Sequence, residues 1–528
     1  LSRATGNRTA HGGDPTRSGR WREVLSLAVA ASLAFGCTPH RLDPASKDRP
    51  LEVLVAQDAE TLDPRFAVDA TAARTTRLMH AGLFKLDETD LRPIPNLARE
   101  AVFEDPKTLR ISLREDVRFH GGKPLVADDV VATIRAIGDP AKSYRQRHVV
   151  AAIGAIEADG IHAVRIHLSR PRATLLSDLE LPILRADEAD APARPDGSLD
   201  GLGPYELEAR EPGVTILRPA KHGISEAKPP IYSVALRAVR DENARALRLL
   251  AGRVDVAPQA FSPLLLPPLE AKFARGHTAR TMGANLTYLV PRIDRGPLTS
   301  TPLRRGLALA IDRERMARTF FAGHAIPATG LLPPRLWAHD GGLIPDDSPF
   351  QFDILRAKAA FAEAGVDATH RVALSFLVST DRFRGTLGRF LAQELAPFGV
   401  DLHVEVLELG VLLDRLGRGD FDLALLQMPE LTEPNALQVF LHSGFIPPLG
   451  SNRGRVRDGE LDALLDEGDQ TSPLDERKAI YAKVERRART LVPWIPLFHE
   501  EQVALVGPRA SAFVPLADGR LNGLAKLE

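Results

Sequence analysis

Alternation of apolar and polar residues predicts several β-strands in the first half of the chain. In "TLRISLRE" the side chains of Leu109, Ile111 and Leu113 fall on one face, and the same period recurs in "AVRIHLS" at 163–169. The segment "LEVLVA" at 51–56 is typical of a strand that opens a folded region. These segments predict a sheet early in the chain.

Apolar residues at helical spacing predict helices between these strands. In "ADDVVATIRAI" at 127–137 they form one stripe, with Asp128 as the expected N-cap. The segment "NARALRLLAG" is a second helix, and Gly252 is its expected C-terminal cap.

Strand and helix patterns alternate more regularly in the second half, which predicts an α/β region with crossover connections. Ser300 or Thr301 is the expected cap of a helix that has Pro302 at its first position. The two prolines of "PWIPLF" at 493–498 predict a strand at a sheet edge. The other expected elements are strands over 372–378, 401–407 and 421–427, helices over 353–365 and 475–491, and a helix that follows the strand 372–378 and ends at about 396.

The start of the chain has the order of an export signal. A basic segment is followed by an apolar run over 24–35, which is too short to span a bilayer, and then by Gly36 and Cys37. This stretch resembles a bacterial lipobox, so we expect a signal peptide at 1–36, lipidation of Cys37 and a polar tether at 37–50. The alternative is that Cys37 is an ordinary small apolar residue.

Composition narrows the classes of protein that fit. A chain of 528 residues predicts two or three domains. Its net charge of -1 becomes more negative once the basic leader is removed, which excludes a nucleic-acid partner that requires a basic patch. Cys37 is the single cysteine, so no intrachain disulfide is expected.

Catalytic and metal-binding motifs are not apparent in the sequence. No nucleophile elbow, zinc-binding H-E-x-x-H or phosphate loop occurs. "FHEEQ" at 498–502 has one histidine beside two glutamates, and we interpret it as the exposed end of a strand. "FHGG" at 119–122 is typical of a turn. We therefore expect no enzyme activity, no cofactor and no metal site.

A series of landmarks resembles the solute-binding lipoproteins that feed peptide and nickel ABC importers. The most specific is "LREDVRFHGGKPLVADDVVATI" at 113–134. The others, in order, are "TLDP" (61–64), "HAGLFKLD" (80–87), "PNLARE" (95–100), "GLGPYEL" (201–207), "LLAGRVDVA" (249–257), "PLRRGLALAIDRERM" (302–316), "AKAAFAEAGV" (357–366), "GDFDLALL" (419–426) and "LDERKAIYAKVE" (474–485).

The resemblance implies an α/β fold of the two-lobed periplasmic binding protein type, with a ligand cleft between the lobes and an extra subdomain on the first lobe. The implied first lobe is discontinuous, at 48–72, 188–279 and 493–528, with the added subdomain at 73–187 and the second lobe at 280–492. The implied function is capture of a peptide-like solute by lobe closure and delivery to an ABC permease. The implied protein is a monomer held by its lipid on the periplasmic or extracellular face of the cell envelope.

The resemblance also places residues in the pocket. Glu433-Pro434 matches the end of a segment that carries the ammonium-binding acid of peptide-binding members, which puts Glu430 at that acid's position. An ammonium in a closed cleft requires such a partner, because an unpaired buried charge is strongly unfavourable. The alternative is that Glu430 is a solvated loop carboxylate. A ligand carboxylate would be held by Arg382 or Arg384.

Other pocket positions depart from the family pattern. Gln427 replaces a tryptophan, Leu431 replaces an aromatic residue, and Leu202, beside Gly203, replaces a threonine. These losses leave a non-peptide ligand open, such as a nickel complex, an oligosaccharide or another small molecule. Two other functions also remain open: a non-transport sensor or scaffold on the same fold, and a secreted hydrolase.

Overall fold

The computed structural model describes residues 49–142, 144–224, 229–341 and 347–528. Pro50–Glu528 forms one compact unit, and Leu1–Arg49 is assigned to another. The expected signal peptide, tether and lipidated Cys37 lie outside the described residues. No helix among the described residues is both long and apolar enough to cross a membrane.

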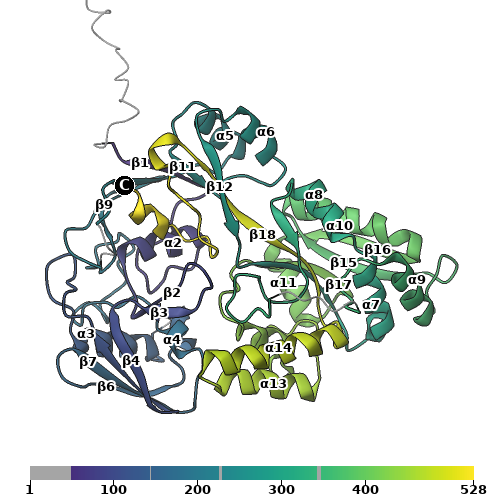
Figure 1. The fold of residues 1–528 in the computed structure, drawn as a ribbon, viewed down its shortest axis with the longest axis horizontal. Coiled ribbons are helices and arrows are strands. Elements are labelled where there is room, and N and C mark those ends of the chain that lie inside the picture. Colours follow the sequence, from purple (N-terminus) through teal and green to yellow (C-terminus); the bar gives the residue numbers. More distant parts are fainter. Residues whose placement is uncertain (1–48, 143, 225–228, 342–346) are drawn as a thin grey trace, which may run out of the picture. The chain divides into compact units, whose positions relative to one another are not determined.

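A large mixed sheet runs through the unit Pro50–Glu528 (Figure 1). Its strands follow the order β16-β15-β17-β13-β18-β11-β1-β10-β9-β8, and β12 and β14 also pair with β18. The bounds of these strands are β1 Leu51–Val55, β8 Tyr205–Glu211, β9 Val214–Pro219, β10 Val234–Ala238, β11 Val256–Pro258, β12 His277–Met282, β13 Leu286–Pro291, β14 Ala325–Pro327, β15 Val372–Ser379, β16 Val400–Leu407, β17 Leu423–Met428 and β18 Ile495–Val506.

The central strand is β18, so the prediction of an edge strand at 493–498 was wrong (Figure 1). Pro493 precedes the strand, and Pro496 lies where the pairing with β13 shifts its register, so neither proline removes a regular ladder bond. The interpretation of 498–502 as an exposed strand end was also wrong. Those residues lie inside β18, where its pairing passes from β13 and β14 to β12.

Most elements expected in the second half are confirmed. Ser300 caps its helix by accepting a hydrogen bond from the backbone N–H of Leu303, and Asp353 caps the helix Ile354–Glu363 in the same way. β15 pairs in parallel with both β16 and β17, as crossover connections require. The helices of this half are α7 Thr301–Ala310, α8 Arg313–Phe321, α9 Ile354–Glu363, α10 Arg382–Leu395, α11 Leu409–Arg418, α12 Ala436–Leu441, α13 Gly459–Gln470 and α14 Leu474–Leu491.

A separate four-stranded antiparallel sheet packs with α3 (Ala127–Gly138) in the first half. The expected N-cap at Asp128 was wrong, because the helix begins one residue earlier and Val126 is the capping position. Asp129 stabilises this end by accepting hydrogen bonds from the N–H groups of Val126 and Ala186. The strand order is β4 (Ala98–Asp105), β5 (Thr108–Leu113), β7 (Ala163–Leu168) and β6 (Ile153–Ala158).

The remaining elements of the first half are short strands and helices outside the two larger sheets. A short hairpin joins β2 to β3, and Asp241 caps α5, which is followed by Gly252 in the left-handed conformation expected there. The elements are α2 Ala70–Met79, β2 Phe84–Leu86, β3 Pro93–Pro95, α4 Leu175–Asp178, α5 Glu242–Leu250 and α6 Leu266–Lys272.

The hydrophobic core is divided into several clusters. One gathers buried residues between 81 and 202 around α3 and the four-stranded sheet. Two clusters consist mainly of residues between 284 and 498. Two further clusters combine 51–79, 205–279 and 503–527, so distant parts of the chain complete one core. The lobe boundaries predicted from the sequence stay a proposal.

Candidate functional site

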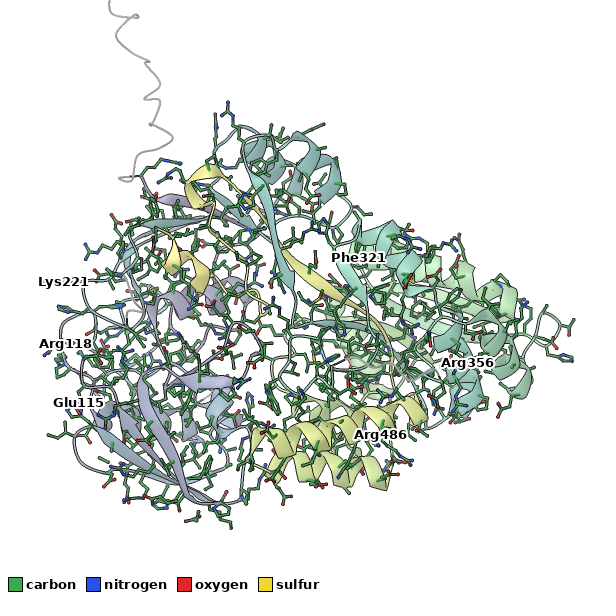
Figure 2. All side chains as sticks on the ribbon, viewed as in Figure 1. Glu115, Arg118, Lys221, Phe321, Arg356 and Arg486 are labelled. Carbon is green, nitrogen blue, oxygen red and sulfur yellow. The ribbon has the colours of Figure 1, made fainter. Side chains whose placement is uncertain are left out.

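A cavity of about 590 Å³ lies beside the middle of β18. Its walls come from α2, from the segment between β11 and α6, from the C-terminal end of α8, from the end of β17 and from the middle of β18. Phe321, labelled in Figure 2, ends α8 and contributes an aromatic ring to the lining. This volume falls in the usual range of small-molecule sites, and the walls bring together segments far apart in the sequence.

One wall carries hydrogen-bonded carboxylates, and we call Gln427, Glu500 and Glu501 the carboxylate face. The Oε1 atom of Glu500 accepts hydrogen bonds from Thr287 Oγ1 at 2.8 Å and from Gln427 Nε2 at 2.8 Å. Gln427 Oε1 in turn accepts from Arg384 Nη2 at 2.6 Å. Burial raises the pKa of Glu500, and the positive charge of Arg384 and the bond from Thr287 oppose that shift.

Glu501 shares this wall with a buried histidine. His324 Nδ1 lies 3.2 Å from Glu501 Oε2, and His324 Nε2 lies 3.5 Å from Glu270 Oε1. The hydrogen bond with Glu501 raises the pKa of His324, while burial and the charge of Arg280 oppose the shift. Protonated His324 therefore carries a positive charge between two carboxylates at the edge of the cavity.

The part of the lining that α2 contributes carries two arginines, and we call Arg74 and Arg77 the arginine face. Both project from α2, which Asp69 caps by accepting a hydrogen bond from the N–H of Ala72. The Nη2 atom of Arg74 donates to Gln259 Oε1 at 2.8 Å. Burial lowers the pKa of Arg74. The residue is half-buried, and its guanidinium stays charged at neutral pH.

Glu430 lies on the loop that follows β17, and its exposed side chain lines the cavity. Its negative charge lies near both Arg74 and Arg77 and partly opposes the lowering of their pKa. The next residue fixes this loop, because the N–H of Leu431 donates to the carbonyl of Ala284 at 2.6 Å. A buried strand thus presents an acidic residue to the cavity on a loop held by its backbone.

The residues expected at the pocket fall into two groups. Glu430 and Gln427 line the cavity, and Arg384 lies directly behind Gln427. Arg382 begins α10, and its side chain is outside the described part of the chain. Leu431 is fully buried in a core cluster and does not reach the lining.

Leu202 and Gly203 lie away from the cavity lining described here. Leu202 is fully buried in the core around α3. The N–H of Gly203 donates to the carbonyl of Met79 at 2.8 Å, and a Cβ atom at Gly203 would come within 2.3 Å of the Leu78 carbonyl oxygen. This close approach anchors the C-terminal end of α2, so the "GLGPY" segment supports the cavity indirectly.

Sequence reasoning missed four charged residues of the lining, namely Arg74, Arg77, Glu500 and Glu501. One signal was available: apolar residues continue through Val506 after "FHEEQ", which is typical of a strand that does not stop at 498. The two arginines are three residues apart on α2, which places them on one helix face. Nothing in the sequence indicates which part of the chain that face meets.

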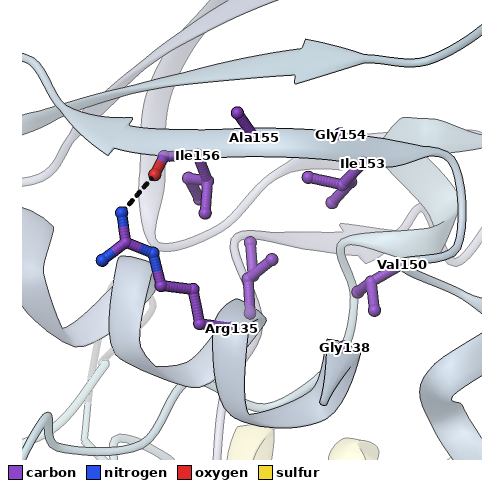
Figure 3. A pocket seen from close by; sticks show the side chains of 8 residues that line it. Arg135, Gly138, Val150, Ile153, Gly154, Ala155 and Ile156 are labelled. Carbon is purple, nitrogen blue, oxygen red and sulfur yellow. Dashed lines mark hydrogen bonds between the residues drawn. The ribbon is translucent and has the colours of Figure 1, made fainter. Parts of the chain in front are cut away.

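A second hollow, of about 310 Å³, lies between α3 and β6 (Figure 3). Its lining is mostly aliphatic, and Arg135 is its charged member. The guanidinium of Arg135 donates to the carbonyl of Ile156 at 2.9 Å. This hollow therefore offers little charge for ligand recognition. Within the described residues, no group of three or more His, Cys, Asp or Glu side chains is arranged to hold a metal ion.

Comparison with known proteins agrees with the resemblance seen in the sequence. The profile of bacterial extracellular solute-binding proteins, family 5 Middle, matches residues 92–443. "Probable di/tripeptide-binding protein 5" of Pseudomonas aeruginosa is 27% identical over 450 residues, covering 78% of this chain and 82% of that protein. The glutathione-binding protein GsiB of Escherichia coli is 25% identical over 511 residues, covering 94% and 96%.

Solved structures show the same fold. NikA from Brucella suis, in complex with Fe(III)-EDTA, matches with a TM-score of 0.79 at 19% identity and covers 90% of this chain and 99% of its own. The periplasmic binding protein DppA from Helicobacter pylori, in complex with the peptide STSA, has a TM-score of 0.71 at 21% identity and covers 90% and 97%. The fold is therefore that of the two-lobed periplasmic binding proteins, as the resemblance implied.

Proposed function

This chain belongs to the bacterial extracellular solute-binding proteins, family 5, and on that premise we propose that it captures a peptide-like solute for an ABC importer. Closure of the two lobes around the solute, followed by delivery to a membrane permease, is the proposed mechanism. No covalent step is part of it, so the protein acts as a receptor and not as an enzyme.

The observation that carries this proposal is the charge distribution of the 590 Å³ cavity. Two arginines and three glutamates line this cavity, which suits a solute that carries both charges, as a short peptide does. The likeness to proteins named for di- and tripeptide and for glutathione binding supports the same class of ligand.

Glu430 is the proposed partner of the ligand ammonium. Its loop position places a carboxylate at the cavity without an ion-pair partner within 4.0 Å among the described residues. A bound ammonium would supply that partner and would lose less solvation there than in an apolar pocket.

The anchor and the location are further parts of the proposal. Acylation of Cys37 would hold a monomeric receptor on the periplasmic or extracellular face of the cell envelope. Intact-mass analysis of protein from its own host is expected to show a mature chain that begins at acylated Cys37. The Cys37→Ser variant is expected to remain unprocessed, and an unmodified N-terminus at another residue would contradict the anchor.

Native mass spectrometry of the same preparation tests the ligand class, because it weighs whatever remains in the cavity. A peptide mass supports the proposal, whereas a metal chelate or a sugar supports the alternative that the lost aromatic positions leave open. Small-angle scattering after ligand removal then tests closure. The radius of gyration is expected to fall when ligand is added back, and an unchanged radius at saturation would favour a non-transport sensor or scaffold.

A further inference from the structure

The arginine face is a pair of cations that share one surface of α2. Arg74 and Arg77 are three residues apart, which places their side chains next to each other on the helix, and both line the cavity. Arg74 has one hydrogen-bond acceptor, the side-chain oxygen of Gln259. Within the described part of the chain, the guanidinium of Arg77 has neither a hydrogen bond nor an ion pair.

Charges of both signs lie near this pair, with Glu430 and Asp518 acting on both arginines and Glu180 acting on Arg77. Arg520 lies close enough that its positive charge lowers the pKa of Arg77, and burial adds to that effect. The two carboxylates near Arg520 are already engaged: Glu180 Oε2 accepts from Arg520 Nη2 at 2.7 Å, and Asp518 Oδ2 lies 2.8 Å from Arg520 Nε. Glu430 is the carboxylate of the cavity lining that acts on both Arg74 and Arg77.

Arg384, one of the two arginines that the sequence suggested for a ligand carboxylate, has another hydrogen-bond partner. Arg384 donates to Gln427 Oε1 at 2.6 Å, behind the carboxylate face, and does not belong to the lining. Its charge also lies near Glu500. A carboxylate that entered the cavity would therefore meet the guanidinium groups of α2 before it met Arg384.

We propose that Arg74 and Arg77 bind a carboxylate of the solute, which makes a free carboxylate a requirement for tight binding. A planar guanidinium group can donate two parallel hydrogen bonds to the two oxygens of a carboxylate. Two such groups on one helix face can bind the same anion. This inference rests on the proposed function and specifies its ligand class as peptide-like solutes with an unblocked acid end.

The test compares matched probes by isothermal titration calorimetry on protein freed of bound solute. The probes are unblocked alanine di-, tri- and tetrapeptides, the same peptides with an amidated C-terminus, and the same peptides with an acetylated N-terminus. Loss of one partner of a desolvated charge pair is expected to weaken binding of the amides by about 30-fold or more. Equal affinity for free acids and amides would overturn the inference and leave the proposed function intact.

Variants assign the effect to the two residues. In the Arg74→Gln/Arg77→Gln double variant, the preference for free acids over amides is expected to fall below about threefold. The exposed Arg486 on α14, labelled in Figure 2, gives the matched control Arg486→Gln, which is expected to keep the preference. A double variant that retains the full preference would place the carboxylate elsewhere and overturn the inference.

Two further measurements keep the test decisive. If the double variant fails to unfold cooperatively, the single Gln variants and Arg77→Lys replace it, and Arg77→Lys is expected to keep part of the preference because it retains charge without the fork. If none of the unblocked peptides binds the parent protein, the proposed peptide function fails and the inference fails with it.

Discussion

The carboxylate face and the arginine face bound the same cavity, but they are held in different ways. Glu500 lies on the central strand, with one carboxylate oxygen fixed by Thr287 and Gln427 and its backbone N–H donating to Asn285 Oδ1 at 2.7 Å. Arg77 projects from a helix on a long side chain that has no such hydrogen bonds among the described residues. The carboxylate face is thus held by hydrogen bonds before a ligand arrives, whereas the N–H groups of Arg77 remain able to donate to a ligand.

This difference indicates that the two faces have different roles in ligand recognition. A carboxylate that is held by neighbouring donors keeps its position at little further cost, which is the condition for preorganised recognition. Guanidinium groups on flexible stems can follow ligands of different length, and they lose side-chain freedom when they bind. We expect the carboxylate face to set orientation and the arginine face to tolerate variation in the solute.

The largest expected effect belongs to Glu430, which lines the same cavity near the arginine face. Glu430→Gln keeps the size of the side chain and removes its charge. If Glu430 holds the ligand ammonium, affinity for alanine tripeptide falls by about 30- to 5,000-fold, which corresponds to about 2–5 kcal/mol. Titration calorimetry measures the loss, with the exposed Glu476→Gln as the control.

The N-acetylated tripeptide sharpens the same experiment. It lacks the ammonium, so Glu430→Gln is expected to leave its affinity unchanged or to improve it, because the nearby carboxylate no longer repels the ligand's acid end. Equal binding of the unblocked peptide by parent and variant would mean that Glu430 is a solvated loop carboxylate.

A smaller effect, on stability, is expected when Glu500 of the carboxylate face loses one of its hydrogen-bond donors. Thr287 is 1% exposed, and Thr287→Val removes its hydroxyl with little change of shape. A hydrogen bond to a charged group contributes about 1.5–3 kcal/mol, so the free energy of unfolding is expected to fall by about that amount. Urea denaturation provides the measurement, and Thr490→Val on the exposed side of α14 provides the control. A loss no larger than the control's would mean that Gln427 alone holds Glu500.

The pH dependence of stability tests His324 at the edge of the carboxylate face. Its pKa is raised by Glu501, so the stabilising interaction is complete below the ordinary histidine pKa and is lost as pH rises through the raised value. We expect His324→Gln to be less stable than the parent by at most about 1 kcal/mol at pH 5.5, with the gap closing at alkaline pH. Thermal unfolding across pH checks this. Glu270 and Arg280 also lie near His324. A stability difference between parent and variant that does not change with pH would rule out a contribution from His324 protonation.

The smallest expected effect concerns the acceptor of Arg74. Gln259→Leu removes the side-chain oxygen that takes its hydrogen bond, without changing any charge. Since this contact is exposed, affinity for alanine tripeptide is expected to change by less than about fivefold, which is below about 1 kcal/mol. A loss as large as that of Glu430→Gln would show that the arginine face is as rigidly positioned as the carboxylate face, and the contrast between the walls would fail.

The parts of the fold that the sequence predicted correctly are those fixed by neighbours along the chain. The helix caps at Ser300 and Asp353 depend on groups three residues away, and the strand at 372–378 depends on local alternation. The helix at 127–137 was placed correctly, but its cap was not, because Asp129 also bonds to Ala186 from a distant segment.

The sequence by itself determined the α/β class, most helices and strands, the family resemblance and Glu430 as a pocket candidate. Only the tertiary structure decided that β18 is central and that its glutamates line the same cavity as Arg74 and Arg77. The physical reason is the distance along the chain over which the interactions act. Caps and alternation are set by residues a few positions apart, whereas a site that joins Arg77 to Glu430 depends on how separate cores pack, and no local pattern encodes that packing.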